Sequence, residues 1–176
     1  MNPTYSIMHP NGKGTGSAIK FEMIPARVMA EGGMMATFVR QATVGAVDAA
    51  TGKRTFPTFD WTNRITVKFT VSEVAEMLQV LQGLKRAVGD SKGFFHRTAK
   101  GATIITFAHK MEAGANPGYA LWLNRKPTEG EQQNIGIFFS MNKAFALSKA
   151  LETALFYMMF GIPEKYDEPK VEPKKN

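Results

Sequence analysis

Aromatic and cationic side chains are the residues of this sequence whose types and spacing could do chemistry. Flat aromatic rings can stack on unpaired bases, and lysine and arginine can pair with a phosphate backbone. Arg64 and Lys68 show the spacing most clearly, because they alternate with apolar residues along 64–70 and so share one face of an extended strand. A basic, hydroxyl-bearing face of this kind fits a polyanion.

The candidate binding residues fall into two classes. The candidates for base stacking are Phe56, Phe59, Trp61, Phe94, Tyr119 and Trp122. The candidates for phosphate contacts are Lys20, Arg40, Lys53, Arg54, Arg64, Lys68, Arg97, Lys100, Lys110, Arg125 and Lys126. Several of these cations lie on or beside segments that carry the aromatic residues, as a surface for single strands requires.

The aromatic candidates also have structural alternatives. Trp61 could equally anchor the core. Trp122 alternates with a leucine on either side, so it is exposed if those leucines face the core and buried if they do not. Phe94 and Phe95 point to opposite faces of a strand, so we expect one in the core and the other at the surface.

Enzymatic and metal chemistry finds little support. The chain has no cysteine, which excludes disulfides, thiol nucleophiles and cysteine metal sites. His9, His96 and His109 form no ligand-spaced cluster, and neither a catalytic triad nor paired carboxylates emerge. The glycine-rich segment 12–17 lacks the spacing of a phosphate-binding loop. We therefore expect a protein that is not an enzyme, with no cofactor and no metal.

The charge points to the same partner. The chain of 176 residues carries a formal net charge of +7. Four lysines and four acidic residues cancel within 164–176, and its two prolines and scarce apolar residues predict a disordered tail over 163–176. The positive charge therefore belongs to the folded part, which favours nucleic acid and, second, an anionic membrane.

The segments that must position these residues repeat one plan. Residues 1–16 are predicted to be flexible, and 17–162 to form one domain of two halves, about 17–88 and 92–161. The first half has strands at 17–23, 34–41 and 64–70, and a mobile hairpin loop at 42–58. The second half has strands at 93–97, 102–110, 119–126 and 134–139, with a turn at 114–118.

A helix closes each half. The capping box of Thr70 and Glu73 begins the first helix, which we expect to end at 85–89 with basic residues in its last turn. Ser140 caps the second helix, 141–160, which is apolar nearly all round in its last two turns and so needs a cover. Strands followed by a helix, twice over, indicate an α+β fold.

The chain contains, in this order, the segments 33–38 (GMMATF), 59–61 (FDW), 65–74 (ITVKFTVSEV) and 93–96 (GFFH). Together these four segments resemble the Whirly family of single-stranded-DNA-binding proteins. The resemblance covers about 17–162. It implies two four-stranded antiparallel sheets, each followed by a helix, a layout that the related positive-cofactor-four coactivators reach as dimers. It also implies tetramers assembled through the helices, and single strands bound along the sheets and between neighbours.

The chain departs from the family at two places. The family's Lys-Gly-Lys-Ala-Ala-Leu strand, linked to DNA binding and higher assembly, corresponds only loosely to 15–20 (TGSAIK). The loop from Ala42 to Phe56 is longer than usual.

We therefore expect a non-enzymatic, largely sequence-independent single-stranded-DNA-binding protein. Its process would be replication, recombination or repair, and its state a homotetramer. RNA binding or annealing, or transcription regulation, is the alternative on the same fold. An assembly protein that binds an acidic partner is the alternative of another class. The N-terminal residues resemble no targeting segment, so an intracellular setting without a membrane, in a bacterium or a virus-infected cell, is favoured over an organelle.

Overall fold

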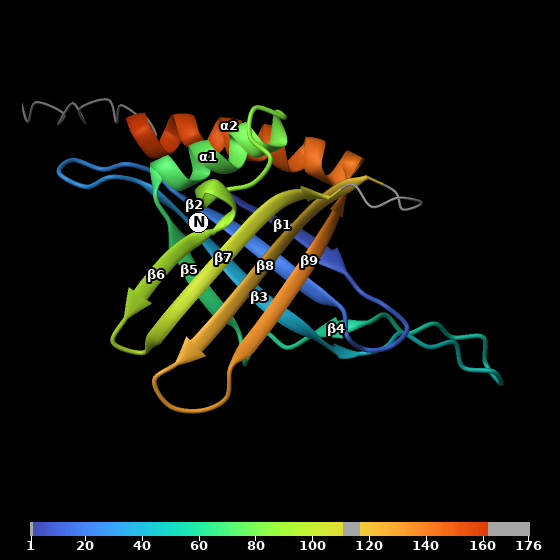
Figure 1. Ribbon diagram of the computed structural model, residues 1–176. Coiled ribbons are helices and arrows are strands. Elements are labelled where there is room, and N and C mark those ends of the chain that lie inside the picture. The colour runs from blue at the N-terminus through green and yellow to red at the C-terminus, as the bar shows by residue number, and fades with distance from the viewer. Residues whose placement is uncertain (1, 111–116, 162–176) are drawn as a thin grey trace, which may run out of the picture.

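Two antiparallel sheets lie across each other, and two helices cover one end of the pair (Figure 1). The computed structural model describes residues 2–110 and 117–161. The first sheet contains β1 (Thr4–His9), β2 (Ser17–Ile24), β3 (Gly33–Thr43), β4 (Thr58–Phe59) and β5 (Ile65–Phe69), and α1 (Val71–Leu81) follows it. The second sheet contains β6 (Phe94–Thr98), β7 (Gly101–Lys110), β8 (Gly118–Pro127) and β9 (Gln133–Ser140), and α2 (Met141–Phe160) follows it.

The second sheet has the four strands that the sequence predicts, in the order β6-β7-β8-β9. The first sheet has the four antiparallel strands of the predicted layout, β1, β2, β3 and β5, and one strand more than predicted: the two-residue β4, which pairs with the end of β3. β1 lies in the segment 1–16 that the sequence predicts to be flexible. Only Ile7 of β1 is buried, so the alternation is too weak to reveal this strand before its pairing with β2 is known.

The core lies between the two sheets, and strand alternation decides which side chains enter it. Ile65, Val67 and Phe69 are buried, whereas the residues between them are exposed, as predicted. On β8, Leu121 and Leu123 are fully buried. Each sheet therefore keeps an outward face free of the core.

The first helix begins as predicted and ends earlier than predicted. The Thr70 side chain accepts the N–H of Glu73, and the Glu73 carboxylate accepts the N–H of Thr70 at 2.8 Å. The helix ends at Leu81 instead of 85–89, because Gly83 takes a left-handed φ of +76° that stops it. No basic residue lies in its last turn, and Leu84, predicted on the apolar stripe, is exposed.

The second helix matches its predicted bounds. Ser140 is its N-cap residue, although its hydroxyl makes no capping hydrogen bond, and Gly161 ends it with a φ of +77°. Leu147, Leu151 and Met158 pack into the core. Among the described residues, none of the helices is long and apolar enough to cross a membrane. The predicted tail over 163–176 and most of the predicted turn at 114–118 lie outside the described residues.

Candidate nucleic-acid interface

The outward face of the second sheet presents exposed apolar side chains in neighbouring registers. Phe95 on β6 pairs with Ile104 on β7. Two residues further along β7, Thr106 pairs with Trp122 on β8, which in turn pairs with Gly136 on β9. The exposed fractions are 63% for Phe95, 42% for Ile104 and 53% for Trp122. We call this surface the outward face. The register assigns to it Phe95, Arg97, Ala102, Ile104, Thr106, Ala108, Lys110, Gly118, Ala120, Trp122, Asn124, Lys126, Asn134, Gly136 and Phe138.

Cations flank this apolar centre at both ends. Arg97 and Lys126 lie in one register on either side of Ala102, and Lys110 lies at the opposite end of β7. Lys100 follows in the turn between β6 and β7. None of the residues assigned to the outward face is acidic, within the part of the chain that the structure describes. The face can therefore attract a phosphate backbone without repelling it at its centre.

Two glycines allow the aromatic rings to lie flat on the sheet. A Cβ atom at Gly136 would come within 2.3 Å of the Trp122 indole, and one at Gly118 within 2.4 Å of the Phe138 ring. Both rings therefore occupy the space that a side chain would fill on the neighbouring strand. A flat ring against backbone leaves its other side open, which is the geometry needed for stacking.

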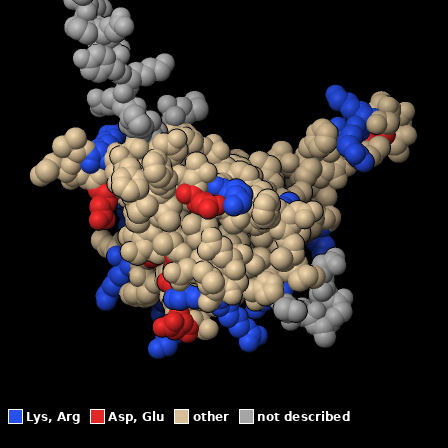
Figure 2. Space-filling model, turned by 90° about the horizontal axis from the view of Figure 1, so that it is seen from above, with Lys and Arg blue, Asp and Glu red and all other residues tan. Residues whose placement is uncertain are grey.

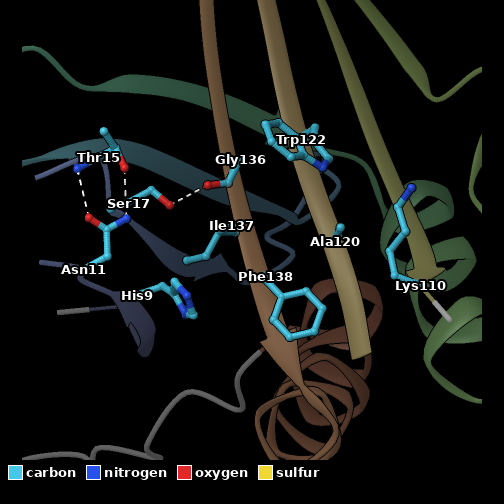
Figure 3. Close-up of a pocket in the computed structure, with 11 residues that line it drawn as sticks. His9, Asn11, Thr15, Ser17, Lys110, Ala120, Trp122, Gly136, Ile137 and Phe138 are labelled. Carbon is cyan, nitrogen blue, oxygen red and sulfur yellow. Dashed lines mark hydrogen bonds between the residues drawn. The ribbon is translucent and has the colours of Figure 1, made fainter. Parts of the chain in front are cut away.

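A groove of about 540 Å³ borders the outward face where the two sheets meet (Figure 3). Trp122, Gly136 and Phe138 line it from the second sheet, and the turn between β1 and β2 lines it from the first. Ser17 Oγ donates a hydrogen bond to the carbonyl oxygen of Gly136 across this junction. The groove thus combines aromatic walls with polar groups, as a site for an unpaired base would.

Gln41 holds the polar wall of the groove in place. Its buried Oε1 accepts the N–H of Asn11 at 2.9 Å and that of Gly16 at 3.1 Å. Asn11 Oδ1 in turn accepts the N–H groups of Lys13 and Thr15. Sequence analysis missed this wall, because Gln41 lies 30 residues from Asn11 and only the fold brings them together.

Two aromatic candidates are buried, which corrects the prediction for them. Phe94 packs edge-on against Phe69 with ring centroids 6.0 Å apart, and Phe95 takes the surface position instead. Tyr119 stacks on Phe107, and its hydroxyl donates to the carbonyl of Leu81 at 3.2 Å. Neither ring is open to a base. Trp122 is exposed, as expected for flanking leucines that face the core.

The first sheet also carries basic residues on its outward face. Lys20 and Lys68 lie there, with Arg64 just before β5. Lys20 Nζ lies 3.8 Å from the carboxylate of Glu22, which compensates part of the charge. This surface could contact phosphates.

Two further cations of the candidate set are placed differently. Arg40 Nη2 donates to the carbonyl oxygen of Asn134 at 2.9 Å and so connects the two sheets. Arg125 pairs in register with Thr103 and Gln133, one residue out of step with the outward face.

The remaining candidates lie outside the sheet faces. Phe59 is half-buried in β4. Trp61 is 36% exposed, and its carbonyl oxygen accepts a hydrogen bond from Arg64 Nη1 at 3.1 Å. Lys53, Arg54 and Phe56 lie in the hairpin between β3 and β4, which projects away from both sheets (Figure 1). The structure therefore does not gather the candidate set on one surface.

Solved structures share this arrangement. The structure superposes on that of WHY1 from Arabidopsis thaliana with a TM-score of 0.66 and 15% sequence identity, over 90% of this chain and 92% of that one. For WHY3 from Arabidopsis thaliana the TM-score is 0.61 at 14% identity, over 90% and 89%. The chain has a Whirly-like fold. The sequence matches no protein-family model and has no significant match among curated proteins, so the likeness lies in the fold.

The resemblance predicted from the sequence is thereby confirmed at the level of the Whirly-like fold. Residues 33–38 begin β3, residues 59–61 lie at β4, and residues 65–74 run from β5 into α1. The segment 15–20, which corresponds loosely to the family's Lys-Gly-Lys-Ala-Ala-Leu strand, leads into β2 beside the groove.

A hydrogen bond connects the first helix of this Whirly-like fold to the second sheet. His96 Nε2 lies 2.6 Å from Glu73 Oε1, and the His96 ring rests edge-on against Phe69. Burial alone raises the pKa of Glu73, but the hydrogen bonds from His96 and Thr70 outweigh burial and hold that pKa below its usual value. The pair is structural, since it lies away from the outward face. No group of three potential metal ligands occurs among the described residues.

Proposed function

We propose that this chain binds single-stranded DNA along the outward face of the second sheet. The observation that carries the proposal is the exposed set of Phe95, Ile104 and Trp122 at the centre of a face without acidic residues and with cations at both ends. A Whirly-like fold suggests a single-stranded nucleic acid as partner, which supports the proposal. Binding itself needs no reaction, so we propose a protein that is not an enzyme.

The geometry supports phosphate contacts at the two ends of the outward face and base stacking at its centre. Arg97 and Lys126 would hold phosphates at one end and Lys110 at the other. Bases between them would stack on Trp122 and Phe95, an interaction open to every base. We therefore propose largely sequence-independent binding, which suits a role in replication, recombination or repair.

The test measures fluorescence anisotropy of a labelled single strand of roughly 30 nucleotides across a salt series. Unlabelled duplex DNA and RNA of the same sequence compete for the protein. We expect tight binding that duplex competes for poorly and that weakens as salt rises. Preferential competition by RNA would assign the face to RNA, whose 2′-hydroxyl groups would then contribute. Absence of binding at low salt would refute the proposal and favour a protein partner.

We further propose that the chain forms a homo-oligomer, a tetramer, through α2. Phe156 and Phe160 contact each other with ring centroids 5.0 Å apart, yet they are 54% and 71% exposed. Phe145 and Met159 on the same helix are exposed as well. Figure 2 shows the helical side of the molecule as largely uncharged. Exposed apolar surface of this extent favours a protein contact.

Light scattering tests the assembly. We expect the mass of a tetramer for the natural chain and a smaller particle for Phe160→Asp, since a charge at the contact opposes its burial. Phe145→Ser on the same helix extends the test toward its other end. A natural chain that scatters as a monomer would refute the proposal.

A further inference from the structure

The hairpin between β3 and β4 is an ordered arm that stands away from the body of the protein. We call residues 44–57 the arm. Backbone hydrogen bonds connect its two sides, from Asp48 N to Lys53 O at 2.9 Å and from Thr55 N to Ala46 O at 2.8 Å. Figure 2 shows the arm as a projection with basic side chains at its outer end. The backbone hydrogen bonds across the hairpin indicate that the arm has a defined conformation.

The tip of the arm is fixed by one carboxylate. Asp48 Oδ1 accepts hydrogen bonds from the N–H groups of Ala50 and Thr51 at 2.9 and 2.8 Å. These hydrogen bonds, chiefly the one from Thr51, hold the pKa of Asp48 below its usual value. Gly52 takes a left-handed φ of +66° and closes the turn. Asp48 is thus held in place by the tip itself and stays ionised, and with Lys53 and Arg54 it leaves the arm with a net charge of +1.

One face of the arm carries a ring and a cation side by side. Phe56 is 74% exposed, and Arg54 lies on the same side of the arm, because both residues line one hollow. Between them lies a shallow hollow of about 290 Å³. Gly45 forms its floor, where a Cβ atom would come within 2.9 Å of the carbonyl oxygen of Thr55.

The side-chain cations of the arm have no interaction partner within the described part of the chain. Neither Lys53 Nζ nor the Arg54 guanidinium makes a hydrogen bond or an ion pair with residues 2–110 or 117–161. An unpaired cation, an exposed ring and a hollow of this size together match the phosphate and base of a single nucleotide. A protein partner would instead need a larger apolar surface than this arm offers.

We propose that the arm is a second contact for single-stranded nucleic acid, separate from the outward face. Phe56 stacks on one base, and Arg54 and Lys53 hold the adjoining phosphates. The inference rests on the proposed function, and it adds to it a longer footprint. Arg54 and Phe56 lie on the returning side of the arm, which projects away from both sheets (Figure 1), so only a strand that extends beyond the sheet face reaches both contacts.

Strand length therefore distinguishes the two contacts. We compare a short strand of roughly 8 nucleotides, enough for one sheet face, with one of roughly 30 nucleotides. We expect Phe56→Ala and Arg54→Gln to weaken binding of the long strand about fivefold or more and to leave the short strand unchanged. Val28→Ala is the matched control, because Val28 is 95% exposed on a different turn.

Each outcome decides the inference. Equal affinity of the natural chain and the arm variants for the long strand overturns it. An equal loss for both strand lengths also overturns it, because the arm would then belong to the outward face. A change in oligomeric mass without a length-dependent loss assigns the arm to a protein contact and overturns it too. A natural chain that binds neither strand refutes the proposed function, a result visible before any arm variant is tested.

Discussion

Replacing Trp122 with alanine is the most informative single change in the outward face. About half of the side chain, 53%, is open to a bound base. Loss of one stacking partner costs about 1–3 kcal/mol per base. At ~1.4 kcal/mol per factor of ten, we expect the Kd for single-stranded DNA to rise roughly 5- to 150-fold.

The same change has a cost in stability that must be separated from binding. The half of the indole that is not exposed lies against Gly136. If it buries on the order of 100 Å² at ~25 cal/mol/Å², the upper limit of the loss is about 2–3 kcal/mol. Leu121 and Leu123 on the other face of β8 stay in the core, so we expect the variant to fold and to melt at a lower temperature.

The assay is anisotropy at fixed salt with the short strand, accompanied by circular dichroism of each variant. Trp122→Phe keeps a flat ring and should give an intermediate affinity. Leu84→Ala, at a position 73% exposed beyond the end of α1, is the control for the loss of an exposed apolar side chain. A folded Trp122→Ala variant that binds as tightly as the natural chain would refute the assignment of this face.

Three further predictions test the structure around the site. Gly136→Ala should displace the Trp122 indole, shift tryptophan fluorescence and weaken binding. Gly12→Ala is the control, because a Cβ atom there meets nothing within 4 Å and should cause none of these effects. Unchanged fluorescence of Gly136→Ala would contradict the packing of the indole against Gly136. Lys126→Ala should weaken binding and lower the slope of log K against log salt by about 0.7, measured by anisotropy from low to physiological salt; an unchanged slope would remove this phosphate contact. Glu73→Gln keeps the capping geometry but loses the carboxylate charge that strengthens the hydrogen bonds with His96 and Thr70, so denaturation should show a loss of about 1 kcal/mol at pH 7. Because the pKa of Glu73 is lowered on folding from its ordinary 4.5, this contribution is present above that pH and disappears as the pH falls through the lowered value, so the two stability curves should converge in acid; a constant difference would contradict the assignment.

Local rules determined much of the fold from the sequence alone. The alternation along β5 and β8 decides which side chains are buried, because successive residues of a strand point to opposite faces. The capping box at Thr70 and Glu73 is a contact between residues three apart, so it needs no tertiary structure to be predicted. The same alternation placed Trp122 opposite its neighbouring leucines.

Alternation could not say which of two opposite faces is the inner one. Phe94 and Phe95 are equivalent by local rules, and only the packing of β6 against Phe69 puts Phe94 inside. Tyr119 shares the face of Leu121 and Leu123, so it became a core residue once that face was covered, and its hydroxyl then reaches Leu81 at the end of α1. These outcomes depend on which element covers each face, and that is decided by the whole chain.

The site itself was decided by tertiary structure. The groove joins Ser17 to Gly136 across 119 residues of sequence, and Gln41 fixes the turn at Asn11 from 30 residues away. The arm separates three predicted contacts, Lys53, Arg54 and Phe56, from both sheets (Figure 1). The sequence determined which side chains can stack and carry charge, because these are properties of residue types. Only the folded chain decided which of them share a surface, because long-range strand pairing sets the distances between them.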